Sequence, residues 1–260
     1  MEKRRAGLTV IIPTRNEAGC LDRLLKLVAP WADEVMVCDS YSTDNTVAIA
    51  HMNNATVLQH EYINSALQKN WVIPQAAHPW VLIIDADELP EPALMKEIDD
   101  FLHHIPESIQ MAYIPRRNTI WGALPGRGIN YPDYQSRLFL RDYGRYQDKE
   151  VHAQVEVPGG HVHFTHALVH NDFKTISTWW LRNDRYFKYE LKELLKRNRK
   201  WSFTLQYIKP FYVFSRVYLR NKLFLHGFKG FFIAFQWGVY HFFVAASLYE
   251  YEHHHNNIKS

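Results

Sequence analysis

The chain has 260 residues and a mass of 30.8 kDa, enough for one large domain or for one domain with an appended region. Hydrophobic residues make up 47% and charged residues 22%, which excludes a disordered or low-complexity chain. Two cysteines, Cys20 and Cys38, are too few for a disulfide scaffold and lack the spacing of a zinc or redox pair. The first residues show no apolar signal segment, so we expect a location on the cytoplasmic side of the membrane.

The net charge of +3 is distributed unevenly along the chain. Residues 1–181 carry 16 basic and 22 acidic side chains, whereas residues 182–229 carry 13 basic side chains against Asp184, Glu190 and Glu193. A basic segment of this kind favours contact with an anionic surface, either a membrane or a nucleic acid. We therefore expect two functional regions.

Strand-like and helix-like patterns alternate in the first part of the chain. Apolar runs rich in β-branched residues predict buried strands, and apolar residues three or four positions apart predict helices. The predicted strands are 8–12, 34–38, 57–59 and 80–84, and the predicted helices are about 21–28, 43–51, 64–76 and a segment opened by Pro90 and Pro92. This alternation predicts an α/β fold whose mostly parallel sheet binds ligands at the carboxyl ends of its strands.

Polar residues follow three of these strands, as the segments 13–17, 39–40 and 85–87. The glycine fingerprints of P-loop and dinucleotide-binding proteins are absent. Asp85 and Asp87 are separated by one residue, so both carboxylates can face one divalent cation that neutralises a diphosphate leaving group. The pattern predicts a site for Mg²⁺ or Mn²⁺, and the alternative is that the two aspartates cap the next helix or stay solvated.

Four motifs in succession, VIIPTRNE, VCDSYSTDNT, LQKNW and WVLIIDADE, resemble the nucleotide-sugar domain of glycosyltransferase family 2. Their order and spacing are most similar to the subgroup that includes lipopolysaccharide core β-glucosyltransferases. The resemblance is strong over about residues 7–100 and looser elsewhere. It implies a GT-A type nucleotide-sugar-binding fold, a UDP-sugar donor and inversion at the anomeric carbon.

The resemblance also implies roles for individual residues. The loop around the nucleotide is matched by Pro13, Thr14, Arg15 and Glu17, and the contact to the uridine part by Asp39. A polar patch before the last strand is matched by Gln68, Lys69 and Asn70, of which Lys69 could reach a phosphate. The aspartate pair at the diphosphate is matched by Asp85 and Asp87, with Asp87 favoured as the direct metal ligand. Without the family pattern, residues 68–70 are interpreted as an exposed helix face and Asp44 as a helix N-cap.

The middle segment is predicted to form the acceptor site. Residues 109–115 have the pattern of a strand, and residues 116–134 form an irregular stretch rich in glycine and proline. Such a stretch is typical of a lid or binding loop. Its Trp121, Tyr131 and Tyr134 could stack on sugar rings, and ordinary loop packing is the alternative.

An inverting transfer needs a base that accepts the proton of the acceptor hydroxyl. The related enzymes carry a Val-His-Glu motif after an Arg-Leu-Phe strand, and this chain has 137–139 as Arg-Leu-Phe and then Val151-His152-Ala153. Because Ala153 stands where a glutamate is expected, the base is predicted to be a neighbour. Glu150 is the first candidate, Asp133 the second and His152 a further one. A shifted alignment and an inactive enzyme are the alternatives.

Four histidines lie within ten residues, at His161, His163, His166 and His170. No cysteine is near and the spacing fits no standard finger, so we do not predict structural zinc. Because His170 matches a histidine of the family pattern, it is expected at the edge of the active site.

The last third of the chain predicts basic and aromatic helices. Helical spacing extends from about residue 175 to 198, Pro210 interrupts the pattern, and a second segment covers 211–225. Residues 230–249 carry no charged side chain and are long enough to span a bilayer, but their many aromatic residues favour the interface. We expect monotopic association, with a true span, packing on the catalytic domain or nucleic-acid binding as alternatives.

These predictions give a catalytic domain over residues 1–172, with a nucleotide-sugar part (1–105) and an acceptor part (106–172), followed by membrane-associating helices over 173–260. The predicted activity is metal-dependent, inverting transfer of a hexose, glucose being expected, from a UDP-sugar to a lipid-linked saccharide such as the lipopolysaccharide core. The predicted location is the cytoplasmic face of the inner membrane, with no nucleic-acid partner. The alternatives are nucleotidyl or phosphoglycosyl transfer, or a non-catalytic membrane- or partner-binding protein, which Ala153 would favour.

Overall fold

The computed structural model describes residues 6–120, 131–147, 153–173 and 176–254. The chain forms two compact units. Unit 1 comprises Met1–Asn118 and Tyr131–Asp172, and unit 2 comprises Thr119–Asn130 and Phe173–Ser260. The functional domains proposed from the sequence stay predictions.

The described part of unit 1 is built on one mixed sheet of nine strands, in the order β3-β2-β1-β4-β7-β6-β11-β5 with β10 paired to β6. The strands are β1 (Leu8–Thr14), β2 (Glu34–Asp39), β3 (Thr56–Gln59), β4 (Trp80–Ile83), β5 (Glu88–Pro90), β6 (Ile109–Ile120), β7 (Asp133–Leu140), β10 (Gly160–His163) and β11 (Leu168–Phe173). A separate ribbon pairs β8 (Arg145–Tyr146) with β9 (Val155–Glu156).

The expectation of a mostly parallel sheet is correct for one half of the sheet and wrong for the other. Strands β3, β2, β1 and β4 are parallel, as the helices between them require. Strand β7 is antiparallel to both β4 and β6, and β5 is antiparallel to β11. Two parallel strands that follow each other in the chain need a long crossover connection, usually a helix. No helix separates the described strands from β6 to β11. The half of the sheet that contains these strands therefore pairs mainly antiparallel.

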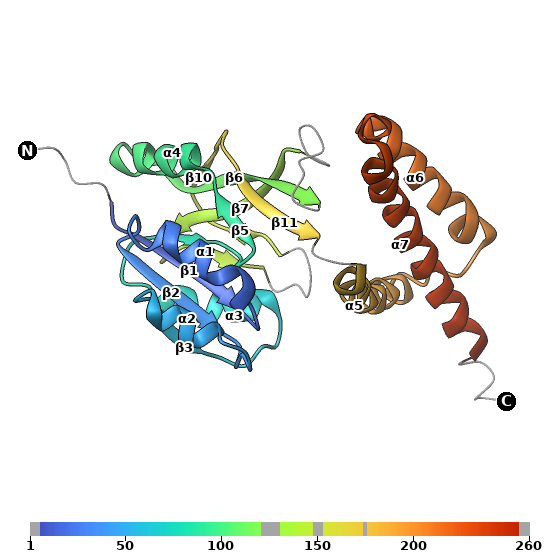
Figure 1. Cartoon of the computed structure of the whole chain (residues 1–260), viewed down its shortest axis with the longest axis horizontal. Coiled ribbons are helices and arrows are strands. Elements are labelled where there is room, and N and C mark those ends of the chain that lie inside the picture. Colours follow the sequence, from blue (N-terminus) through green and yellow to red (C-terminus); the bar gives the residue numbers. More distant parts are fainter. Residues whose placement is uncertain (1–5, 121–130, 148–152, 174–175, 255–260) are drawn as a thin grey trace, which may run out of the picture. The chain divides into compact units, whose positions relative to one another are not determined.

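The parallel strands are apolar throughout because both faces of the sheet are covered. On one face, alternate residues of β1, β2 and β4 pack against α1 (Ala18–Val28), α2 (Thr46–Met52) and α4 (Pro92–His103). On the other face, the residues between them pack against α3 (Ser65–Val72), the following 3₁₀ turn (Ile73–Gln75) and the β8–β9 ribbon. Figure 1 shows this layered arrangement around the central strands.

Three predicted boundaries differ from the structure. The helix for which Thr43 or Asp44 was predicted as N-cap begins at Thr46, and Asp44 accepts hydrogen bonds from the backbone and hydroxyl of Thr46. The helix expected to reach residue 76 becomes a 3₁₀ turn after Val72, where Pro74 cannot donate a helical hydrogen bond. The irregular stretch expected over 116–134 is shorter, because β6 continues to Ile120 and β7 begins at Asp133.

Apart from the last residues of β6 and β11, the described part of unit 2 is helical. It contains α5 (Ile176–Lys196), a π-helical turn (Thr204–Ile208), α6 (Lys209–Arg220), a 3₁₀ turn (Leu223–His226) and α7 (Gly227–His254). Pro210 lies in the first turn of α6, where its missing N–H costs no hydrogen bond. One stretch among the described residues, Leu223–His253, is long and apolar enough to cross a membrane.

Candidate active site

The loops that follow β1 and β2 are tied together by hydrogen bonds. Asn16 adopts a left-handed backbone conformation (φ 58°), its backbone N–H donates to Ser42 Oγ and its side-chain oxygen accepts from the backbone of Thr43, both at 2.8 Å. The backbone N–H groups of Glu17 and Ala18 donate to Thr46 Oγ1 and to Asp44. These bonds fix the loop that carries Arg15 and Glu17. No separate role was predicted for Asn16.

Within this loop the predicted nucleotide-binding residues take different positions. Pro13 pairs with Cys38 across the two parallel strands, and Thr14 is buried with its hydroxyl 3.3 Å from Asp39. Arg15 is exposed, and its guanidinium lies 6.0 Å from the ring centre of Tyr62. Arg15 is therefore the loop residue with a cationic side chain open to a ligand.

Asp39 ends β2 and is completely buried. Its carboxylate accepts hydrogen bonds from the backbone and hydroxyl of Ser42, from Gln59 at 3.1 Å and from Thr14. In this arrangement Asp39 holds the loop after β2 in place. Its contact with a uridine stays a prediction.

The predicted polar patch on α3 separates into three different contacts. Gln68 is buried and donates to the carbonyl of Cys38 and to Ser40, so it ties α3 to the end of β2. Asn70 exchanges two hydrogen bonds with the backbone of Tyr146. Lys69 alone of the three points to the acidic strand end, with Nζ 3.3 Å from Asp85 Oδ1.

A charged cluster, comprising Lys69, Asp85, Glu88, Arg116 and Arg137, lies beyond the end of β4. The Arg137 guanidinium donates to Asp85 Oδ2 at 2.6 Å and to Glu88 Oε1 at 2.7 Å. Arg116 lies 3.8 Å from Glu88. Glu88 is completely buried, and Arg137 is 4% exposed.

A β-bulge directs Arg137 into this cluster. Along β6 and β7, Ala112 faces Leu138 but the next residue, Tyr113, faces Ser136, so Arg137 is an extra residue without a partner on β6. Bulges of this kind re-aim one side chain and are frequent beside active sites. The bulge explains how a strand residue comes to contact two carboxylates that follow β4.

The cluster separates the pKa values of its two carboxyl groups. Withdrawal from solvent would raise the pKa of Asp85, but the charges of Arg137 and Lys69 outweigh it and hold that pKa well below its ordinary value. Burial raises the pKa of Glu88, and the negative charge of Asp85 adds to this effect while Arg137 opposes it. Asp85 is therefore ionised at neutral pH.

Asp87 lies beside His170 rather than beside the cationic groups that contact Asp85. His170 is opposite Glu88 in the β5–β11 pair, which brings its Nε2 to 3.5 Å from Asp87 Oδ2. Its Nδ1 is 2.8 Å from the side-chain oxygen of Asn118 and must donate to it. Nε2 of His170 and the Asp87 carboxylate thus face each other, as two ligands of one metal ion would.

This pair fits a divalent metal ion. Two ligands at about 2.1 Å from one octahedral ion lie about 3 Å apart, close to the observed separation. A histidine that binds a metal commonly donates its other ring nitrogen to an oxygen acceptor, as His170 does to Asn118. In the described part of the chain, no group of three or more His, Cys, Asp or Glu side chains is arranged to hold a metal. Asp85, bound by two cations, stays a predicted ligand.

Of the three predicted bases, only Asp133 lies in the part of the chain that the structure describes. Asp133 is linked to the charged cluster, because Arg116 donates to its Oδ2 at 2.8 and 3.0 Å, and Gln135 donates to its Oδ1. Glu150 and His152 lie outside the described residues. Ala153 is partly buried against the apolar cluster beneath the β8–β9 ribbon, so this position contributes packing.

Sequence reasoning missed Arg137, Arg116, Glu88 and Asn118 as site residues. The signal for Arg137 was weak, because a charged residue within the apolar pattern of a strand is also typical of an edge position. The pairing of β6, β7 and β5 brings these four residues to the acidic strand end, and that pairing is not encoded by local spacing.

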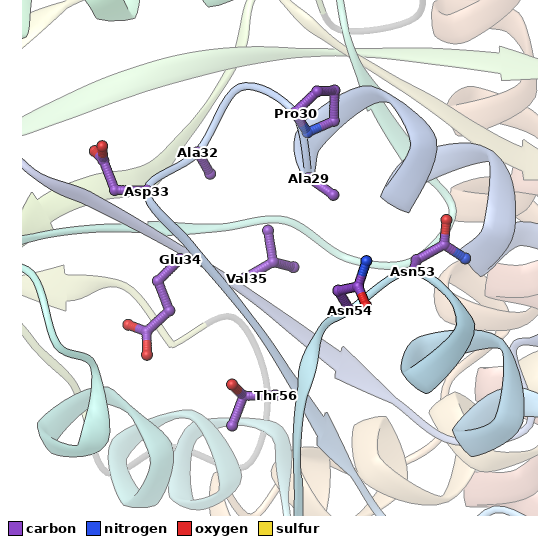
Figure 2. A pocket seen from close by; sticks show the side chains of 9 residues that line it. All are labelled: Ala29, Pro30, Ala32, Asp33, Glu34, Val35, Asn53, Asn54 and Thr56. Carbon is purple, nitrogen blue, oxygen red and sulfur yellow. The ribbon is translucent and has the colours of Figure 1, made fainter.

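A surface depression of about 470 Å³ lies elsewhere in unit 1 (Figure 2). It is lined by the beginnings of β2 and β3 and the ends of the preceding helices, including Asp33, Glu34 and Thr56. Asp33 accepts from the backbone of Leu8, and Glu34 accepts from Thr9 and from the backbone of Ala77. Ligands of open α/β sheets bind at the opposite, carboxyl ends of the strands, so this depression is not the candidate active site.

The chain is similar to several known proteins. The Glycosyl transferase family 2 profile matches residues 9–157, more than half of the chain. The lipopolysaccharide core biosynthesis glycosyltransferase LpsC of Rhizobium meliloti (strain 1021) is 28% identical over 253 residues, which cover 94% of this chain and 92% of that protein. An uncharacterized glycosyltransferase of Rickettsia felis is 38% identical over 98 residues, 38% of this chain, and the match covers only 33% of that protein.

Solved structures show a more distant likeness. Glucosyl-3-phosphoglycerate synthase from Mycobacterium tuberculosis, in complex with Mn²⁺, UDP and glucosyl-3-phosphoglycerate, matches with a TM-score of 0.41 and 20% identity. The match covers 53% of this chain and 57% of that chain.

The family match and the site together define the class of protein as a glycosyltransferase with a GT-A-like α/β fold and a mixed sheet. Within that class, the chain belongs to glycosyltransferase family 2. The motifs that resemble this family in the sequence all lie inside or at the start of the matched segment, so the resemblance is confirmed.

Proposed function

We propose that this glycosyltransferase moves a glucosyl residue, with inversion, from UDP-glucose to a lipid-linked saccharide of the lipopolysaccharide-core type. The observation that carries the proposal is the pair Asp87–His170 next to the charged cluster at the carboxyl ends of the parallel strands. The similarity to LpsC over nearly the whole of both chains supports the acceptor class.

The donor would lie over the loop after β1 and the end of β4. Lys69 and Arg15 provide positive charge for the diphosphate, and Asp85 is held ionised where it can accept hydrogen bonds from a ribose or a sugar hydroxyl. Asp87 and His170 would hold Mg²⁺ or Mn²⁺. When bound, that ion neutralises the charge that develops on the leaving UDP.

In the transfer, an acceptor hydroxyl oxygen attacks the anomeric carbon from the side opposite UDP. The new glycosidic C–O bond forms as the bond from the anomeric carbon to the phosphate oxygen breaks, and UDP leaves with that electron pair. The proton of the hydroxyl passes to a base of the chain. Glu150, Asp133 and His152 remain the candidates, and of these Asp133 contacts Arg116 and Gln135.

Thermal unfolding with UDP and UDP-sugars, with and without Mn²⁺, tests the donor site. A ligand at about 100 times its Kd stabilises a protein by about 2.7 kcal/mol, which corresponds to a shift of about 5–10 °C for a chain of this size. We expect a metal-dependent shift that is lost in Asp87→Asn and retained in the matched control Asp100→Asn, which changes an exposed aspartate of α4. A shift of equal size in Asp87→Asn would contradict the proposed metal site.

Product analysis tests the reaction type. Glucosyl transfer releases UDP, nucleotidyl transfer releases pyrophosphate, and phosphoglycosyl transfer releases UMP and attaches a sugar phosphate. We expect UDP release that depends on a lipid-linked saccharide, with a β-linked product from the α-linked donor.

A non-catalytic protein is the second candidate, and the packing of Ala153 in an apolar cluster favours it. It predicts that cells in which Asp87→Asn replaces the native chain keep normal lipid-linked saccharides. The transferase proposal predicts truncated ones.

A further inference from the structure

We infer that unit 2 binds the surface of an anionic bilayer, with α7 lying in the plane of the interface and its exposed aromatic side chains inserted among the lipids. This inference goes beyond the proposed function and depends on none of the active-site residues. It also supplies a physical reason for a lipid-linked acceptor.

Helix α7 carries an exposed aromatic row along one side. Phe228, Phe231, Phe235, Phe242 and Tyr249 recur at spacings of three, four, seven and seven residues and are between 39% and 71% exposed. Such spacings place side chains on one side of a helix, so these five residues form the α7 aromatic stripe, about 30 Å long. Trp237 and Tyr251 are also exposed but lie off the stripe.

Much of the rest of α7 is covered by the other helices of unit 2. A Cβ on Gly230 would lie 1.9 Å from the carbonyl oxygen of Leu223, and one on Gly238 would lie 3.1 Å from that of Pro210. On α5, Phe187 is 8% exposed and its ring lies 5.3 and 5.7 Å from those of Tyr240 and Phe243. Helix α7 is therefore packed on one side and open along the stripe.

The outer side of α6 continues this apolar surface. Phe231 of the stripe has ring contacts with Phe214 and Tyr218 of α6, at 5.7 and 6.4 Å. Figure 1 shows α6 running alongside α7. Beyond these contacts, the outer side of α6 exposes three large apolar side chains, Phe211, Tyr212 and Leu219.

A row of basic residues borders this surface on α6. Lys209, Arg216 and Arg220 are exposed and recur at seven- and four-residue spacings, so they share one side of the helix. By the same spacing they lie next to Tyr212 and Leu219 and away from the side that contacts the stripe. Exposed Lys222 and Lys229 flank the turn between α6 and α7. Apolar side chains bordered by cations are the composition of helices that bind anionic lipid surfaces.

The packing argues for the interface and against a span. The apolar stretch over Leu223–His253 is long enough to cross a bilayer by itself. However, α7 is packed against α6, whose 12 residues extend about 18 Å and cannot cross a hydrocarbon core of about 30 Å. It is also packed against α5, which exposes Lys188, Lys192 and Lys196. Moving α7 into the core would bury these charges or break the packing.

Co-sedimentation of the full-length protein with vesicles tests the inference. We expect binding to vesicles of phosphatidylcholine with about 30% phosphatidylglycerol, and at least about tenfold weaker binding to phosphatidylcholine alone or in about 0.5 M NaCl. Equal binding to neutral and anionic vesicles, or binding to neither, would overturn it. Tighter binding to an oligonucleotide, with vesicles failing to compete, would overturn it as well.

Variants locate the surface. Phe231→Ser with Phe235→Ser should weaken vesicle binding about tenfold or more, and Arg216→Gln with Arg220→Gln about tenfold. The matched controls change exposed residues of unit 1: Tyr143→Ser with Met52→Ser for the aromatic pair, and Lys26→Gln with Lys96→Gln for the basic pair. Controls that weaken binding as much as the test variants would overturn the assignment. Circular dichroism shows whether each variant is folded.

Extraction distinguishes the two membrane modes. A protein bound at the interface is released from membranes by alkaline carbonate, whereas a spanning helix remains, so retention would overturn the in-plane arrangement.

The failure of this inference is separable from that of the proposed function. Loss of vesicle binding with an intact UDP-dependent thermal shift rejects the surface alone, and Asp87→Asn should bind vesicles like the native protein.

Discussion

The two units of this protein place their charged and apolar side chains in opposite ways. Unit 1 buries charges: Asp39 and Glu88 are fully inaccessible, and Lys69 and Arg137 are less than a tenth exposed. Unit 2 keeps its described Lys and Arg side chains at the surface. It also carries 19 of the 28 large hydrophobic side chains that are exposed in the described part of the chain.

This difference shows what each unit needs from its surroundings. Buried ion pairs are expensive and are maintained only with good geometry, so those of unit 1 indicate a site that must hold charges in fixed positions. An exposed surface of contiguous aromatics is rare in soluble proteins and indicates a missing partner. Unit 1 therefore keeps its distinctive charged groups inside, and unit 2 presents the surface that we propose binds a membrane.

Removing the buried guanidinium of Arg137 should have the largest effect on the difference between the two units. We expect Arg137→Met to destabilise the protein by about 3–5 kcal/mol, because it leaves the buried Glu88 carboxylate without its close partner. The matched Arg216→Met, at an exposed position of α6, should change stability by less than about 0.5 kcal/mol. Scanning calorimetry measures both. Adding Glu88→Leu to Arg137→Met should recover part of the loss, and a double variant less stable than the single one would contradict this explanation.

The hydrogen bond between His170 and Asn118 allows a second test in unit 1, with a smaller expected effect. Asn118→Ala removes the oxygen that accepts from His170 Nδ1, so we expect metal affinity to fall about 10–100-fold while the fold is kept. The midpoint of the Mn²⁺ titration in the presence of UDP gives this value. Asn198→Ala, at an exposed position of unit 2, should leave the midpoint unchanged.

A smaller effect is expected from Cys38, which is completely buried in unit 1. Burial raises the pKa of its thiol from 9.0 to about 11. Between these two values the unfolded chain loses the thiol proton and the native protein keeps it, so stability falls as the pH rises through this window. The contribution is at most about 2.7 kcal/mol, because each pKa unit corresponds to about 1.4 kcal/mol.

Urea unfolding at several alkaline pH values measures this effect. Because lysines and tyrosines also titrate there, the relevant quantity is the difference between native protein and Cys38→Ala. We expect the stability of the native protein to fall more steeply with pH than that of Cys38→Ala. If the stability of both proteins fell equally with pH, the expected effect of burial on the pKa of the Cys38 thiol would be contradicted.

The parallel half of unit 1 was predictable because each of its elements is defined locally. The apolar runs that became β1, β2 and β4 are buried on both faces, so their composition alone identifies them. The polar strand ends follow from chain order, since parallel strands end at the same edge of the sheet. Lys69 was expected to reach a phosphate on the strength of a family motif, and its contact with Asp85 was not predicted.

The antiparallel half of unit 1 was predicted less well for a physical reason. The antiparallel pairing of β7 with β4 and β6 joins residues far apart in the chain, and the bulge at Arg137 changes which side chain faces the site. Likewise, His170 was expected near the active site, but its contact with Asp87 depends on the pairing of β5, a strand that was not predicted. Segments whose position depends on partners elsewhere carry little local signal.

The sequence by itself determined the family, the parallel sheet with its acidic strand ends and the basic, aromatic character of the last third, because composition and spacing are local properties. The tertiary structure alone decided which charges meet: Arg137 with Asp85 and Glu88, and His170 with Asp87. It also decided which side of α7 is open, because burial by α5 and α6 depends on how helices pack and not on hydrophobicity along one helix.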